Sequence, residues 1–448
     1  MKRKRIEQCA ATRAENNQED PTGPAIMTDP KIRKIPYPYH AMLAICSDLD
    51  ETPGKREYFE IARFLNTEEE TAMGPGVGLE VGNTLYFDMP DNQFAYWNTD
   101  DEGRENARRL IRSGHIDCFH SYGDLAVDRG YVERALNELE SHDCCIKVWV
   151  DHSKAATNFD PGIMFGKGDL EGHEAFHSDL TYRHGVRYVW RGRVTSVIGQ
   201  DCAKGYGGLW SIKHALPAAK TILKDFVKSL LALKNHPKYA LHKGNRLIYP
   251  ASLRSGESVT EFMRCNPHWG GVSAGETAQG IPEVLTDSVL STLTRKRAKS
   301  IIYTHLGKIA DRAEIFSEAT RNGFRRLKGY ADRREILVAT TYRLLQYTKM
   351  TEQIRVEETE DGDLILINLV TGGAEYDLSG LTVYTEKPES IRLTIDNEPV
   401  KNFEINGPDE TGKASISIPW TKLTFPDLDS YANLNSTIQS LLPRFQTN

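Results

Sequence analysis

The feature that most limits the fold of this chain is a long alternation of short apolar runs with helical segments. It extends from Ile35 to about Lys349. The apolar runs resemble buried strands, and the segments between them carry apolar residues at helical spacing. The predicted strands cover residues 41–46, 116–119, 145–150, 185–190, 299–303 and 336–341, and the predicted helices cover 56–65, 102–113, 131–141 and 220–233. This alternation predicts an α/β fold with a largely parallel sheet, open or closed as a barrel.

The pattern changes after about Lys349, where short β-rich runs are separated by Asp, Gly, Asn and Pro. These runs predict a small antiparallel, sandwich-like β-module. The first 34 residues are polar and lack periodicity, which is typical of a disordered arm. We therefore expect a disordered arm over 1–34, an α/β domain over 35–350, and a β-module with a short tail over 351–448.

Composition excludes several classes of protein. The chain has 448 residues, with 56 basic and 62 acidic side chains, so it lacks the basic excess of a nucleic-acid-binding protein. No apolar run predicts a secretory signal or an integral membrane segment. The seven cysteines form no C-x-x-C pair and several lie in apolar runs, which favours buried free thiols in a reducing cytoplasm. Nothing in the sequence excludes a homo-oligomer.

Several of the predicted strands end abruptly in an acid or an imidazole. The carboxyl ends of parallel strands meet at one edge of a sheet or barrel, so these side chains are expected to form one composite site. Imidazole and carboxylate are the ligands of catalytic zinc, whose bound water loses a proton near neutral pH. The six candidate residues are Asp48, Asp50, His120, Asp124, His152 and His305.

The order of these segments resembles the NodB-type polysaccharide deacetylases, carbohydrate esterase family four. The family's first motif is a strand that ends in two acids, one a base and one a metal ligand, and Ser47-Asp48-Leu49-Asp50 is similar to it. His120-Ser121-Tyr122-Gly123-Asp124 occupies the place of the second motif, His-Ser/Thr-x-x-His. Tyr303-Thr304-His305 resembles the late Leu-x-His motif, which supplies the catalytic acid. The resemblance covers roughly residues 36–348.

This resemblance implies a deformed (β/α) barrel and the metal-dependent removal of an acyl group, N-acetyl above all, from a sugar. The expected substrate is a saccharide or a nucleotide- or lipid-linked sugar used in building a surface glycan. The implied catalytic residues are Asp50 and His305. The implied ligands of a divalent metal, most simply Zn²⁺, are Asp48, His120, Asp124 and His152.

The chain departs from the family at three places. Leu49 separates the two acids, so either Asp48 or Asp50 can be the base and the other the ligand. The distal histidine of the second motif is replaced by Asp124, and His152 is then the candidate for the missing imidazole. The family's Arg-Pro motif is not recognisable in its usual place.

Two other functions compete with this one. His173-Glu174-Ala175-Phe176-His177 matches the H-E-x-x-H pattern of zinc metalloproteases, which requires a helix that places both histidines on one face. The glycines at 166, 168 and 172 and the surrounding strand–helix alternation do not favour such a helix. A carbohydrate-binding or scaffold protein on a barrel that has lost its activity is the other alternative, because the family's motifs are substituted.

Overall fold

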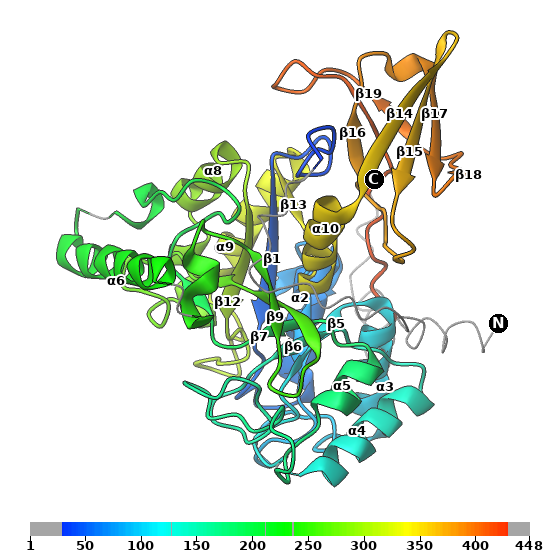
Figure 1. The fold of residues 1–448 in the computed structure, drawn as a ribbon. Helices are drawn as coiled ribbons and strands as arrows, with labels where there is room; N and C mark the ends of the chain where they lie inside the picture. Colours follow the sequence, from blue (N-terminus) through cyan, green and yellow to red (C-terminus); the bar gives the residue numbers. More distant parts are fainter. Residues whose placement is uncertain (1–28, 127, 211, 235–236, 429–448) are drawn as a thin grey trace, which may run out of the picture.

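The computed structural model describes residues 29–126, 128–210, 212–234 and 237–428 (Figure 1). Most of the predicted N-terminal arm and the last 20 residues lie outside the described residues. Ile32 and Arg33 are buried, and Ile32 forms a β-bridge with Val383. Residues 29–34, which the sequence assigned to the arm, therefore belong to the folded structure because their apolar and ionic side chains pack against a later sheet.

A large curled sheet forms the centre of a mixed α/β fold. Its strand order is β8–β11–β12–β1–β4–β5–β6–β7–β10–β9, and β13 also pairs with β1. The strands are β1 (Ala41–Ser47), β4 (Asn83–Leu85), β5 (Ile116–His120), β6 (Val148–Val150), β7 (Tyr188–Trp190), β8 (Val194–Thr195), β9 (Ile248–Ser252), β10 (Ser258–Phe262), β11 (Arg264–Cys265), β12 (Lys299–Thr304) and β13 (Ile336–Val338). Every pair is parallel except β9·β10. The predicted, largely parallel sheet is thus confirmed.

The curl of the sheet follows from two interrupted strands. Residues 191–193 alone separate β7 from β8, and Met263 alone separates β10 from β11. The pairs β7·β10 and β8·β11 therefore join the same two chain segments, with Thr260 opposite Tyr188 and Cys265 opposite Thr195. β11 also pairs with β12, and β12 pairs with β1. The strand pairs that start at β1 and continue through β4, β5, β6 and β7 therefore lead back to β1 through β10, β11 and β12.

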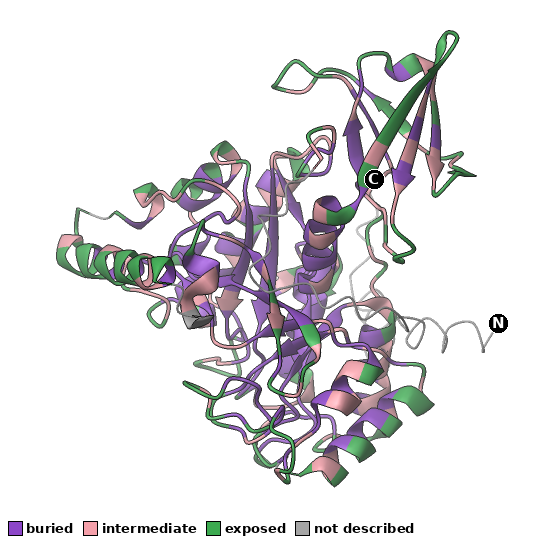
Figure 2. Cartoon of the chain, viewed as in Figure 1, coloured by how far each residue is buried: buried purple, intermediate pink, exposed green. Residues whose placement is uncertain are grey.

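Helices surround the sheet (Figure 1). They are α2 (Lys55–Asn66), α3 (Asp101–Ser113), α4 (Arg129–Ser141), α5 (Ser178–His184), α6 (Ala215–Leu233), α7 (Ile281–Val284), α8 (Asp287–Arg295), α9 (Glu318–Asp332) and α10 (Thr341–Gln353), with 3₁₀ turns at Gly207–Leu209, Pro237–His242, Ala278–Gly280 and Pro388–Ser390. Asp100 caps α3 by accepting a hydrogen bond from the Gly103 amide, and Gly114, at φ 83°, ends it. Figure 2 shows the sheet buried and the outer faces of α3 and α4 exposed. All seven residues of β1 are buried, as expected for a parallel strand covered on both faces.

Two smaller sheets follow α10. The four-stranded sheet has the order β14–β15–β17–β18 and the three-stranded sheet the order β16–β20–β19. Their strands are β14 (Arg355–Asp361), β15 (Leu364–Val370), β16 (Thr382–Tyr384), β17 (Ile391–Ile395), β18 (Glu398–Pro399), β19 (Glu404–Asn406) and β20 (Ser415–Ser417); a separate short hairpin pairs β2 (Glu70–Thr71) with β3 (Gly74–Pro75). The prediction of a purely antiparallel arrangement is wrong for β15·β17, which is parallel, because the chain between them contributes β16 to the other sheet.

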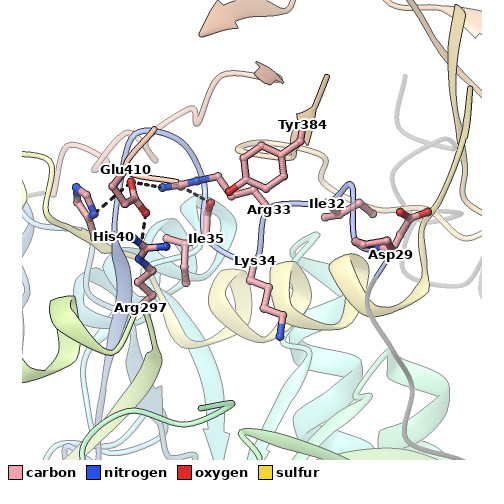
Figure 3. A pocket seen from close by; sticks show the side chains of 10 residues that line it. Asp29, Ile32, Arg33, Lys34, Ile35, His40, Arg297, Tyr384 and Glu410 are labelled. Atoms are coloured by element: carbon pink, nitrogen blue, oxygen red, sulfur yellow. Dashed lines mark hydrogen bonds and ion pairs between the residues drawn. The ribbon is translucent and has the colours of Figure 1, made fainter. Parts of the chain in front are cut away.

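The smaller sheets share an apolar core with the large one. Ile367 and Val383 lie in the same buried cluster as Met42 of β1 and Tyr347 of α10. Beside this core lies a cavity of about 270 Å³, shown in Figure 3. On its rim Glu410 forms ion pairs with Arg297 (3.1 Å), Arg33 (3.6 Å) and His40 (3.6 Å). Apolar packing and ion pairs therefore both join the C-terminal sheets to the rest.

Two further sequence predictions concern membrane-spanning segments and the state of the cysteines. No helix in the described part of the chain is both long and apolar enough to cross a membrane. The thiols of Cys46, Cys118, Cys144, Cys202 and Cys265 are free, and four of these five residues are buried. Cys145, in contrast, is disulfide-bonded, which departs from the set of free thiols that the sequence suggested.

Candidate active site

The carboxyl ends of the parallel strands surround a cavity of about 350 Å³. β1, β5, β6 and β12 each end at its rim, so residues that are far apart in the sequence meet there. The structure brings all six predicted residues to this one cavity. Its lining includes Asp48, Asp50, His120, Asp124, His152 and His305, together with Trp190, Tyr303, Glu276 and Lys308.

Asp48, just after β1, is held by a buried arginine. Arg264 donates hydrogen bonds of 2.7 and 2.8 Å to the two carboxylate oxygens of Asp48. Its guanidinium also lies against the rings of Trp190 (3.6 Å) and Tyr303 (4.4 Å). Both partners are almost fully buried, with side-chain exposures of 0% and 2%. A two-point contact of this kind fixes the carboxylate in one orientation.

Asp50 has a different environment. Its Oδ2 pairs with Lys308 Nζ at 3.2 Å, whereas its buried Oδ1 has no hydrogen-bond partner. His305 Nε2 lies 3.5 Å from that oxygen. Burial raises the pKa of Asp50, while the charges of His305 and Lys308 act in the opposite direction. Asp50 is therefore a desolvated carboxylate with one oxygen open to a cation or a proton.

A tight turn after β5 brings Asp124 back toward β6. The turn requires Gly123, whose φ is 122° and whose missing Cβ would lie 2.0 Å from the carbonyl oxygen of Asp88. As a result, Asp124 Oδ1 lies 2.6 Å from Nε2 of His152, which follows β6. This contact lowers the pKa of Asp124.

Tyr86, directly after β4, connects the two imidazoles. Its hydroxyl forms a short hydrogen bond with Nδ1 of His120 and a second one, of 3.1 Å, with Nδ1 of His152. Burial holds the pKa of Tyr86 well above its usual range and that of His120 well below, so the phenol stays protonated and the imidazole neutral. One tautomer satisfies the whole chain: His120 donates to Tyr86, Tyr86 to His152, and His152 to Asp124. In that state Nε2 of His120 keeps its lone pair.

His305, after β12, faces both carboxylates. Its Nδ1 lies 3.1 Å from the carbonyl oxygen of Glu276, to which it can only donate. The other nitrogen, Nε2, lies 3.5 Å from Asp50 and 3.9 Å from Asp48. A protonated His305 would therefore direct its Nε2–H toward the two acids, which is the arrangement of a proton donor.

The side chains around the cavity are of the types that bind a divalent cation. Among the described residues, however, no three His, Cys, Asp or Glu side chains are grouped around one metal position. Asp50 offers an oxygen without a partner, and Nε2 of His120 lies 3.6 Å from Asp48. The adjoining Asp124–His152 pair adds one further carboxylate and one further imidazole. Zinc binds this mixture of ligands. Asp50, His120 and Asp124 are the residues that would hold it in this tautomer, because both ring nitrogens of His152 are already hydrogen-bonded.

The H-E-x-x-H segment lies elsewhere. Residues 173–177 form turns ahead of α5, so the helix that a zinc metalloprotease needs is not formed here. Glu174 is exposed, while His177 is fully buried. The two ring nitrogens of His177 bond to Thr181 Oγ1 and to the carbonyl oxygen of Thr157, both at 2.8 Å. His177 is thus a satisfied core histidine, and the match to the motif reflects no shared geometry.

Sequence reasoning missed three residues of the site. Arg264 stands in the apolar run Phe262-Met263-Arg264-Cys265, and a lone cation in such a run was the available signal. Tyr86 and Lys308 carried no signal of this kind, because neither belongs to a motif. Comparison with protein-family models, with curated proteins and with solved structures found no match for this chain.

Proposed function

We propose that this protein is a metal-dependent amide hydrolase that removes an acyl group, most simply acetyl, from a sugar nitrogen. The observation that carries the proposal is the buried, unpartnered Oδ1 of Asp50, beside imidazoles at the carboxyl edge of a parallel sheet. Lys308 pairs with the other oxygen of this carboxylate, and a bound cation would supply a partner for the buried Oδ1. When bound, such a cation polarises an acyl carbonyl and acidifies water.

We infer the roles of the two acids from their surroundings. Arg264 occupies both oxygens of Asp48, so Asp48 suits an oriented proton acceptor better than a metal ligand. Asp50, His120 and Asp124, which His152 orients, are then left to hold the cation. His305 protonates the leaving amine, since its Nε2 faces the cavity and its Nδ1 is fixed by Glu276. The proposal thus chooses one of the two assignments that Leu49 leaves open for the acid pair.

The cavity suits a small polar substrate. About 350 Å³ lies at the lower end of the range for ligand pockets and accommodates roughly one sugar residue. Trp190, Tyr303, Met89 and Met164 contribute apolar surface to the lining, which suits contact with a sugar ring and an acyl methyl. The proposed substrate is a saccharide or a nucleotide- or lipid-linked sugar of surface-glycan synthesis.

The proposal extends to the fold. We infer that the large sheet is a deformed (β/α) barrel of the polysaccharide-deacetylase type. The return path through β7/β8, β10/β11 and β12 supports it, because this path connects the two ends of the sheet. The two C-terminal sheets would then form the small all-β, sandwich-like module of the same proposal.

Release of acetate from N-acetylated glucosamine oligomers tests the function. With zinc supplied, the wild-type protein should release acetate, and His305→Ala should lose at least about a hundredfold in kcat, the usual contribution of a positioned acid. Glu174→Gln is the matched control and should keep full activity, because Glu174 is exposed outside the site. Absence of turnover on every N-acylated sugar would contradict the proposal and favour a non-catalytic binding protein. Loss of activity in Glu174→Gln would reopen the metalloprotease alternative.

A further inference from the structure

Helix α6 (Ala215–Leu233) carries its apolar side chains on the outside. Leu216 is 85% exposed, Leu223 61% and Leu233 65%, and Phe226, Val227 and Leu230 are about half exposed. Figure 1 shows that α6 projects from the side of the molecule, and Figure 2 shows its outer face exposed along most of its length. At 3.6 residues per turn, Leu216, Leu223, Val227 and Leu230 lie along one line, with Phe226 and Leu233 beside it.

The inner face of α6 is small and polar. Its buried residues are Ala218, Thr221, Asp225 and Ala232. Thr221 donates a hydrogen bond of 2.9 Å to the carbonyl oxygen of Trp269. Asp225 accepts hydrogen bonds from Thr195 (2.9 Å) and Lys204 (3.0 Å). A surface helix normally turns its apolar face inward, so this reversed arrangement leaves the apolar face for something outside the chain.

The charges around this face identify the occupant. Between residues 210 and 234 there are five lysines and one acid, in a chain whose net charge is -6. Lys213, Lys220, Lys224 and Lys234 are exposed, whereas the single acid, Asp225, is buried and paired with Lys204. A second copy of the chain would bring no acidic side chain from this segment to meet these lysines. The phosphate groups of anionic lipids would meet them.

We propose that α6 is a membrane-surface helix that lies in the headgroup region of an anionic bilayer. Its apolar line enters the acyl boundary, and Lys220 and Lys224, on the adjoining side of the helix, contact lipid phosphates. Trp210 and Ile212, which precede α6 and are 57% and 89% exposed, extend the apolar surface. This proposal is independent of the hydrolase activity, because none of these residues lines the catalytic cavity.

Vesicle co-sedimentation of the full chain tests the proposal. The protein should sediment with vesicles of phosphatidylcholine mixed with phosphatidylglycerol, and much less with phosphatidylcholine alone. The triple variant Leu216→Ser/Leu223→Ser/Leu230→Ser should lose about tenfold or more in vesicle affinity, since it removes the apolar contact. Lys220→Gln/Lys224→Gln should lose about thirtyfold on the anionic vesicles. Both variants change exposed side chains, and circular dichroism checks that they remain folded.

The matched control is Ile405→Ser, which removes a half-exposed apolar side chain from β19, far from α6 in the sequence. It should bind vesicles like the wild type. Absence of binding to anionic vesicles, or equal binding by wild type and triple variant, would overturn the proposal. So would a stable dimer, seen by light scattering, that the triple variant converts to monomer without any vesicle binding, because a second copy would then cover the face.

Discussion

Replacing Arg264 by methionine should destabilise the protein by about 3–5 kcal/mol, the usual cost of leaving one partner of a buried ion pair alone. Arg264 and Asp48 have side-chain exposures of 0% and 2%, so water cannot replace the two hydrogen bonds of 2.7 and 2.8 Å. Methionine keeps an apolar contact with Trp190 and Tyr303, so most of the loss should come from the uncompensated carboxylate.

A double-mutant cycle isolates that charge effect. In an Asp48→Asn background there is no carboxylate for Arg264→Met to leave unpaired. The substitution should therefore cost clearly less there than in the wild type. Urea unfolding followed by circular dichroism gives the four free energies, provided that the m values agree. Lys31→Met is the comparison at an exposed ion pair, Lys31–Glu358, where we expect less than about 1 kcal/mol. Equal costs of Arg264→Met in both backgrounds would refute the reasoning, because the pair would then contribute no coupling.

Three further predictions concern other parts of the molecule. Asp409→Ala should destabilise the protein by about 2 kcal/mol in urea unfolding, since it removes the 3.1 Å partner of the buried Arg33 but leaves its 3.6 Å pair with Glu410; an unchanged midpoint would contradict this. Burial lowers the pKa of His177 to about 4, so about 3 kcal/mol of the free energy of unfolding is present above pH 6.5 and is lost as the pH falls toward 4. Unfolding measured across this range should show a shallower pH dependence in His177→Asn than in the wild type. Identical slopes would count against this prediction. Tyr86→Phe should weaken zinc binding about 10- to 100-fold in calorimetric titration, since it removes the hydrogen bond that orients His120, whereas an unchanged affinity would contradict a role for Tyr86 in orienting this histidine.

The fold was predictable where the signals are local. The predicted run 41–46 corresponds to β1, the run 299–303 to β12, and the predicted helix 102–113 to α3, which Gly114 ends. Buried parallel strands read as continuous apolar runs, and a helix end needs only a glycine in the left-handed region, so short windows of sequence contain this information. The parallel β15·β17 pair was not predictable in this way, because it depends on where the intervening strand β16 goes.

The same distinction applies to the site. Asp48, His120 and His305 follow or end strong apolar runs, and the parallel sheet alone requires them to meet at one edge. Arg264 reaches Asp48 across 216 residues, through a register that only the folded sheet defines. The H-E-x-x-H match failed for the opposite reason. This local pattern can bind zinc only where a helix places both histidines on one face. At residues 173–177 the chain forms turns instead.

Zinc stoichiometry, measured by elemental mass spectrometry after loading and dialysis, tests the central claim most directly. The account predicts about one zinc per chain in the wild type and in Glu174→Gln, and little or none in Asp50→Asn and His120→Ala. Circular dichroism ensures that the two site variants are folded. A full complement of zinc in Asp50→Asn, or no zinc in the folded wild type, would contradict the assignment of this cavity as a metal-dependent active site.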